Sequence, residues 1–178
     1  MQNTNNILQI LTIPSSVGLA ILLLATQGQE RNPAKETNYL PVIQIQLMDS
    51  TMTFCTNEIK KNEATIIVYF SPDCEYCHEQ IKNMADSINL LNEVKIVFIT
   101  GEHLDPSKAN RIFPEKLIIK NIIIGTDILN SFYKLYNSPS IPYTLFYGKS
   151  HRLMSTHQGT TSVKSLIKTL SIINEESN

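Results

Sequence analysis

Residues 69–78 read YFSPDCEYCH, so two cysteines, Cys74 and Cys77, stand two residues apart. Before them, residues 64–70 are β-branched and aromatic with no polar alternation after Thr65, which predicts a buried central strand. After them, apolar side chains recur at steps of three and four residues, which predicts one buried helix face: Cys77, Ile81, Met84, Ile88 and Leu91. Residues 94–99 predict another strand. The cysteines therefore lie in a βαβ unit, at the carboxyl end of its first strand.

A cysteine pair at the start of a helix is suited to redox chemistry. The first sulfur lies at the helix N-terminus, where unpaired backbone N–H groups and the helix dipole stabilise a thiolate. The second sulfur lies one turn inside the helix, within bonding reach. Chain order and burial then favour Cys74 as the attacking thiolate and Cys77 as the thiol that resolves a mixed disulfide.

A second segment, SIPYTLFY at residues 140–147, makes a resemblance specific. With the cysteine pair, it resembles the thioredoxin fold, and in detail the extracytoplasmic TlpA-like thiol-disulfide oxidoreductases. In that family a cis-proline in this loop faces the cysteines. The resemblance implies that Ile141 and Pro142 bind the substrate chain, and that Cys74 and Cys77 are catalytic and form a reversible disulfide.

The resemblance covers residues 39–174, nearly all of the chain beyond its N-terminal segment. Gly159 falls where the family has a glycine after its last strand, and residues 105–136 resemble the family's central insertion. The implied fold is α/β and thioredoxin-like: a central mixed sheet flanked by helices, with an N-terminal β-hairpin and the insertion. Residues 175–178 would form a C-terminal tail.

The chain also departs from this family at positions that matter for proton transfer. Val68 occupies the place of thioredoxin's buried aspartate, and Gln80 replaces an acid that some TlpA-like members carry. Glu79 is adjacent to Gln80 but about 100° around the helix. The sequence therefore does not identify the proton acceptor for the second thiol.

Acidic side chains surround the cysteine pair at Asp73, Glu75 and Glu79. Negative charge opposes thiolate formation and disfavours a strongly oxidising couple, so we expect a reductase rather than an oxidase. The expected substrate is a protein disulfide, and the expected electron donor is a membrane protein. The chemistry of a cysteine pair calls for no cofactor.

The N-terminus predicts export or membrane attachment. Residues 7–25 are mostly apolar, and residues 26–38 are a polar tether, so we expect residues 1–25 to be a signal peptide or an anchor and the domain to be periplasmic. Against this, no lysine or arginine precedes the stretch, whereas Arg31 and Lys35 follow it. A packed helix of a cytoplasmic protein is the alternative.

Patterns elsewhere predict the remaining elements. Strands are expected over residues 42–47 and 52–54, then over 120–124, 143–147 and 151–157. Asp105 and Pro106 predict a helix towards Phe113, and the last helix is expected over residues 162–173. Asp127 is expected to cap a helix whose apolar stripe contains Ile128, Leu129, Phe132, Leu135 and Tyr136.

Composition limits the other function classes. The chain has 178 residues, which suits one domain. It has 15 basic and 16 acidic side chains, and the basic ones form no cluster in the sequence. Nucleic acid is therefore not an expected partner. A non-catalytic interaction domain that uses the same groove remains an alternative. Zinc would need two further ligands, and copper would need a histidine such as His103, His151 or His157. We expect Cys55 to be a small buried apolar side chain.

Overall fold

The computed structural model describes residues 38–48, 51–118, 121–137 and 139–175. The predicted signal peptide or anchor at residues 1–25, the tether up to residue 37 and residues 176–178 of the tail lie outside these ranges. Within them, no helix is long and apolar enough to cross a membrane.

Across the described residues, seven strands form one mixed sheet in the order β2-β1-β5-β4-β3-β6-β7. The central strands β3, β4 and β5 run parallel, and the other neighbours pair antiparallel. The strand bounds are β1 Gln44–Leu47, β2 Thr53–Cys55, β3 Ala64–Tyr69, β4 Val94–Thr100, β5 Ile122–Asp127, β6 Tyr143–Tyr147 and β7 Leu153–Gln158. The predicted α/β fold with a mixed central sheet and an N-terminal hairpin is confirmed.

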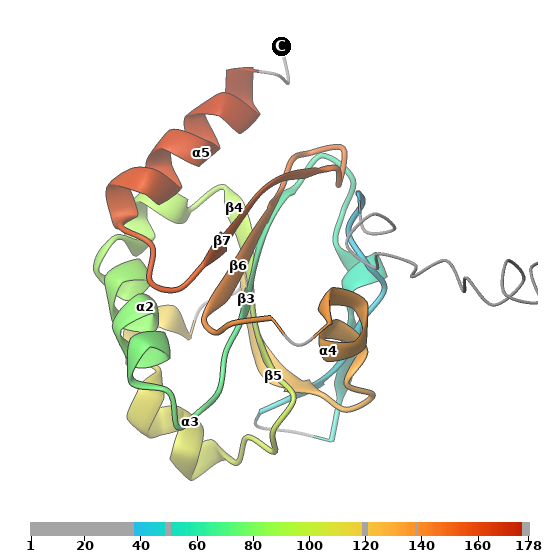
Figure 1. Cartoon of the computed structure of the whole chain (residues 1–178), viewed down its shortest axis with the longest axis vertical. Helices are drawn as coiled ribbons and strands as arrows, with labels where there is room; N and C mark the ends of the chain where they lie inside the picture. The colour runs from blue at the N-terminus through green and yellow to red at the C-terminus, as the bar shows by residue number, and fades with distance from the viewer. Residues whose placement is uncertain (1–37, 49–50, 119–120, 138, 176–178) are drawn as a thin grey trace, which may run out of the picture. The chain divides into compact units, whose positions relative to one another are not determined.

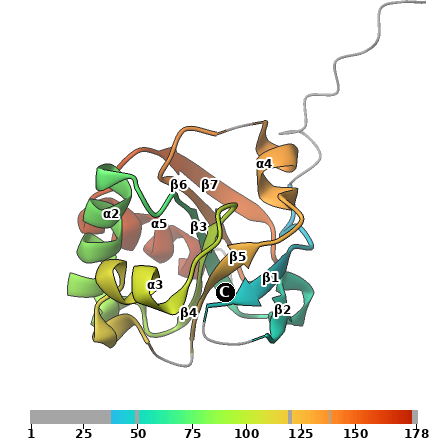
Figure 2. The ribbon, with the colours of Figure 1, turned by 90° about the horizontal axis from the view of Figure 1, so that it is seen from below.

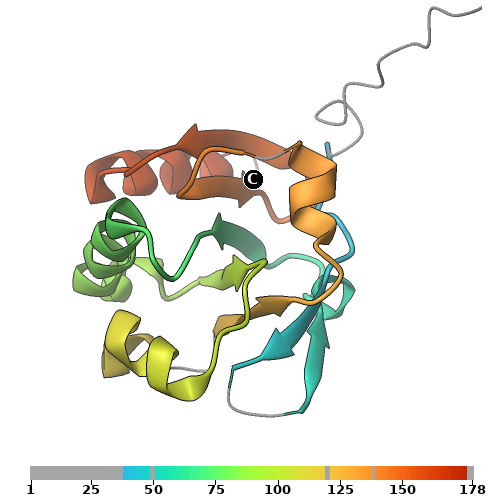
Figure 3. The ribbon, with the colours of Figure 1, turned by 60° about the horizontal axis from the view of Figure 1, so that its bottom comes forward.

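Helices cover both faces of this sheet (Figures 1 and 2). On one face lie α2 (Glu75–Asp86), α3 (Pro106–Ile112) and α5 (Val163–Glu175), and α4 (Ser131–Tyr136) lies on the other, which the view in Figure 3 also shows. Short 3-10 helices occur at Thr56–Glu58, Ile88–Leu91 and Glu115–Leu117.

Strand β3 is buried along its whole length because it separates two apolar clusters. Ile66 and Val68 pack with residues of α2, whereas Ile67 and Tyr69 pack with Phe132 of α4. Successive side chains of a strand point to opposite faces, so a strand covered on both faces needs apolar residues at every position. This explains the absence of polar alternation in the sequence.

The sequence prediction was wrong in the segment from β5 to α4. The strand begins at Ile122 rather than residue 120 and continues to Asp127, which pairs with Ile45 of β1. Ile128 and Leu129, expected on the helical stripe, precede α4 and are 45% and 54% exposed. These residues form the turn between the end of β5 and α4, so α4 begins after the first residues of the apolar pattern.

The expected cap of α4 is nevertheless present in part. The Asp127 carboxylate accepts a hydrogen bond from the Phe132 backbone N–H at 2.7 Å. The residue in the N-cap position is Asn130, which adopts a left-handed conformation with φ of 50°. Asp127 therefore stabilises the first turn of α4 from the end of the strand.

Candidate active site

Cys74 and Cys77 lie in different environments at the start of α2. Cys74 is the N-cap of the helix and is half-buried, whereas Cys77 is fully buried. The Cys74 sulfur accepts a hydrogen bond from the Cys77 backbone N–H at 3.2 Å. Both residues are free thiols in the structure, as is Cys55. The first sulfur is thus the accessible one, and a backbone donor points at it.

The buried thiol resists ionisation. Burial raises the pKa of the Cys77 thiol to about 12, and its hydrogen bond with Cys74 and the negative charges of Cys74 and Glu102 act in the same direction. A hydrogen bond from the Ser71 backbone acts against them. Val68 is fully buried in the apolar cluster that also contains Cys77, so this position of β3 supplies no carboxyl group.

Gln80 also fails to supply an acid, and its amide has a structural role. The side chain is fully buried, and its Oε1 accepts a hydrogen bond from the Thr161 backbone N–H just before α5. Its Nε2 has no hydrogen-bond partner among the described residues. The adjacent Glu79 is exposed. Gln80 therefore ties α2 to the start of α5.

The loop before β6 has the predicted backbone geometry. The Ile141–Pro142 peptide bond is cis, as the resemblance implies. The Pro142 carbonyl accepts a hydrogen bond at 2.8 Å from the N–H of Gly159, which has φ of 80° directly after β7. Because Tyr143 pairs with Tyr69 at the end of β3, this loop lies beside the segment that leads into the cysteines. The four predicted site residues thus gather at one edge of the sheet.

Sequence reasoning missed the charged groups that the segment after β4 and helix α3 bring to this edge. Glu102 accepts a hydrogen bond from the Ser71 hydroxyl, three residues before Cys74. Lys108 of α3 forms an ion pair with Asp73, with 3.2 Å between Nζ and Oδ2. One signal could have found Glu102: it follows a buried parallel strand, whose carboxyl end lies beside that of β3.

The histidines have other contacts. The Nε2 atom of His78 lies 2.8 Å from the Pro72 carbonyl oxygen, that of His151 lies 3.1 Å from the Lys60 carbonyl oxygen, and His157 contacts Ser155 and Phe146. Among the residues that the structure describes, no three His, Cys, Asp or Glu side chains form a group that could hold a metal ion.

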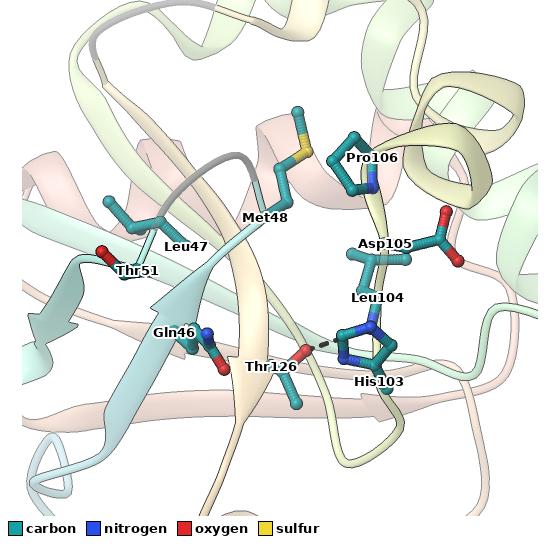
Figure 4. A pocket seen from close by; sticks show the side chains of 9 residues that line it. All are labelled: Gln46, Leu47, Met48, Thr51, His103, Leu104, Asp105, Pro106 and Thr126. Atoms are coloured by element: carbon teal, nitrogen blue, oxygen red, sulfur yellow. Dashed lines mark hydrogen bonds between the residues drawn. The ribbon is translucent and has the colours of Figure 1, made fainter.

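A cavity of about 290 Å³ also borders the segment between β4 and α3 (Figure 4). Most of its lining comes from the end of β1 and from this segment, including Met48, His103 and Asp105, and Thr126 of β5 also contributes. Figure 4 shows the Asp105 carboxylate pointing away from the other lining side chains, and it accepts a hydrogen bond at 2.9 Å from the Lys108 backbone N–H. Its acid therefore caps α3, and no cysteine lines this cavity.

Neither a protein-family model nor a curated protein sequence matches the chain. Solved structures do match. A secreted disulfide oxidoreductase of Mycobacterium tuberculosis has a TM-score of 0.60 at 14% identity, covering 72% of this chain and 94% of its own. An exposed lipoprotein thioredoxin of Streptococcus pneumoniae has a TM-score of 0.59 at 14% identity, covering 74% and 99%. A 2-Cys peroxiredoxin of Plasmodium vivax has a TM-score of 0.63 at 13% identity, covering 79% and 97%. The fold of this chain is thioredoxin-like.

Proposed function

We propose that the protein is a thiol-disulfide oxidoreductase that reduces disulfides of exported proteins. The observation that carries this proposal is the unequal cysteine pair: an accessible sulfur at the N-terminus of α2 and a buried one a turn later, beside a cis-proline loop. The likeness in fold to thiol-disulfide oxidoreductases supports it. So does the hydrogen bond that the Cys77 backbone N–H donates to the Cys74 sulfur at the start of α2.

The reaction has two exchange steps. In the first, the Cys74 thiolate attacks one sulfur of the substrate disulfide, and the other substrate sulfur leaves as a thiolate that takes a proton from solvent. In the second, Cys77 loses its proton and attacks the Cys74 sulfur, which releases the second substrate thiolate. Two electrons pass to the substrate, and Cys74 and Cys77 become a disulfide. A dithiol donor on the membrane would reduce this disulfide again.

The loop at Ile141 and Pro142 would hold the substrate. A polypeptide lying beside this loop as an added strand places its disulfide over Cys74. The Gly159 hydrogen bond to the Pro142 carbonyl fixes the position of the loop. Ile141 packs against both apolar clusters, which holds its backbone in place.

Charge supports reduction rather than oxidation. Glu75 and Glu79 are exposed on α2, and Glu102 lies beside Ser71. A thiolate-rich reduced form, which makes a strong oxidant, is disfavoured in such surroundings. The expected N-terminal leader at residues 1–25 and the secreted or exposed nature of two structural neighbours support an extracytoplasmic, periplasmic location.

The test combines single-cysteine variants with the reduction potential. We expect Cys74→Ser to abolish disulfide reduction, Cys77→Ser to accumulate a mixed disulfide, and Cys55→Ser, the matched control, to remain active. Equilibration with glutathione and dithiothreitol should give a potential near about −270 mV, whereas about −120 mV would indicate an oxidant. An active Cys74→Ser variant would refute the assignment. The absence of any reversible couple would favour a non-catalytic interaction domain, which the buried Val68 and Gln80 in place of acids also favour.

A further inference from the structure

A cavity of about 370 Å³ adjoins the proposed redox site. It lies where the carboxyl ends of β3 and β4 meet α4 and the loop that precedes Pro142. Its lining includes Ser71, Gly101, Glu102, Asn130, Tyr133 and Ile141. Ser71 and Ile141 belong to the two segments that carry the cysteines and the cis-proline, so the cavity is beside the path of a bound substrate chain.

The side chains at this cavity present a carboxylate, an amide oxygen and hydroxyl oxygens that can accept hydrogen bonds. The Glu102 carboxylate accepts a hydrogen bond from the Ser71 hydroxyl and retains further lone pairs. A Cβ atom at Gly101 would lie 2.6 Å from Asn130 Oδ1 and 2.9 Å from Tyr69 Oη, so both oxygens lie close to the Gly101 backbone. The absence of a side chain at Gly101 thus leaves both oxygens at the cavity wall.

The charge around the cavity is negative. Among the described residues that line it, Glu102 is present and none is a lysine or an arginine. Asp127, at the end of β5, is 1% exposed, and its Oδ1 has no hydrogen-bond partner among the described residues. Burial, followed by the charges of Asp127 and Glu102, raises the pKa of the Tyr69 hydroxyl, so both carboxylates act on this wall.

The neighbouring lysines are engaged elsewhere. Lys108 pairs with Asp73, and Lys134 donates a hydrogen bond from Nζ to the Leu129 carbonyl at 2.8 Å. Among the described residues no lysine or arginine forms an ion pair with Glu102, so its negative charge can be met by a cation from another molecule.

We propose that this cavity binds the cationic side chain, lysine or arginine, of a residue that flanks the reactive cysteine in the substrate polypeptide. This inference rests on the proposed function. In an extended chain, residues two positions apart are about 7 Å apart on the same face. A long side chain two residues from the cysteine can then reach the cavity, where its ammonium or guanidinium group can donate hydrogen bonds to the Glu102 carboxylate and to the oxygens of Asn130 and Tyr69.

The experiment compares two disulfide peptides that are identical except for lysine or glutamate two residues from the cysteine. With the full chain, we expect kcat/KM to be about tenfold higher for the lysine peptide, the order of a charge-assisted hydrogen bond. Glu102→Gln, which keeps an acceptor for Ser71, should bring the ratio close to one. Each ratio compares the two peptides on the same protein variant, so any effect of the substitution on the reactivity of the cysteines cancels.

Glu93→Gln is the matched control. Glu93 is exposed and precedes β4, whereas Glu102 follows it, so the two carboxylates lie at opposite ends of a strand about 23 Å long. This variant should keep the tenfold ratio. Equal rates for both peptides, or an unchanged ratio in Glu102→Gln, would overturn the proposal.

Binding separates this inference from the redox assignment. Calorimetry with the same peptides carrying serine in place of cysteine measures the preference for lysine without any exchange chemistry. A binding preference for the lysine peptide that is lost in Glu102→Gln supports the inference. If neither disulfide peptide is reduced, that result counts against the proposed function alone. Equal dissociation constants for the two serine peptides would overturn the inference.

Discussion

Val68 and Gln80 occupy the two positions where an acid could have accepted the Cys77 proton, and this predicts slow closure of the mixed disulfide at neutral pH. Burial raises the pKa of the Cys77 thiol to about 12. At pH 7 the thiolate fraction is then roughly 10⁻⁵, and it rises about tenfold with each pH unit. In the mixed disulfide Cys74 no longer ionises, which removes part of the shift, but burial and the charge of Glu102 remain. We expect the closure rate to follow pH with the same steepness.

Gln80→Glu should relieve this limit. Gln80 is three residues after Cys77 on the same helix face, where Cβ atoms are about 5–6 Å apart. The glutamate keeps an oxygen for the Thr161 N–H and replaces only Nε2, which has no partner among the described residues. A positioned general base contributes about 10²-fold or more, so we expect closure to be about 100-fold faster at pH 7.

Stopped-flow reaction with Ellman's reagent measures this step directly. In a Cys55→Ser background, attack by Cys74 releases one thionitrobenzoate and leaves a second on its sulfur, which Cys77 releases by closing the disulfide. The first phase reports attack, and the second phase reports closure. In the parent, the second phase should accelerate about tenfold per pH unit between about pH 6 and about pH 9. In Gln80→Glu it should be faster and less dependent on pH.

Asn83→Asp provides the matched control. It makes the same change from amide to carboxylate on α2, but at a half-buried position about 240° around the helix from Cys77. This variant should behave like the parent. A second phase that is independent of pH in the parent would refute the reasoning, since Cys77 would then already have a proton acceptor.

Two further predictions concern stability, measured by urea unfolding. Phe132 is fully buried and stacks on Tyr69 with 4.5 Å between ring centroids, so Phe132→Ala should lose about 3–5 kcal/mol; a loss below about 1 kcal/mol would contradict this packing. At Gly125, a Cβ atom would lie 2.1 Å from the backbone oxygen of Gln46, so Gly125→Ala should lose about 3 kcal/mol. Gly159→Ala is its control: φ is 80° but no atom is near, so the expected loss is about 1 kcal/mol, and equal losses would refute the steric argument.

Elements that depend on local pattern could be predicted from the sequence. The run at residues 64–70 forms β3 over Ala64–Tyr69, and Asp105 with Pro106 starts α3 as expected. The stripe after Cys77 is buried as predicted, although α2 ends at Asp86 and its last members, Ile88 and Leu91, belong to a separate 3-10 helix. Burial depends on which side chains face the sheet. The apolar side chains keep facing the sheet where the α-helix is followed by the 3-10 helix.

Other features depend on contacts between distant segments. Ile128 and Leu129 fit an apolar stripe, but exposed apolar side chains are common, so periodicity alone did not locate the start of α4. The pairing of Lys108 with Asp73 and of Glu102 with Ser71 joins residues more than 30 positions apart. Only the packing of β4 beside β3 brings these charges to the cysteines.

The two candidate functions differ in the lifetime of one intermediate. Cys77 is fully buried and Cys74 is half-buried, so exchange with a protein disulfide begins at Cys74. The mixed disulfide then lasts until Cys77 loses its proton, and the apolar Val68 and the amide of Gln80 slow that loss. A lifetime shorter than the residence of the substrate gives a reductase, whereas a longer one gives a protein that holds its partner covalently. The closure rate, rather than the presence of the two sulfurs, therefore decides between an enzyme and a binding domain.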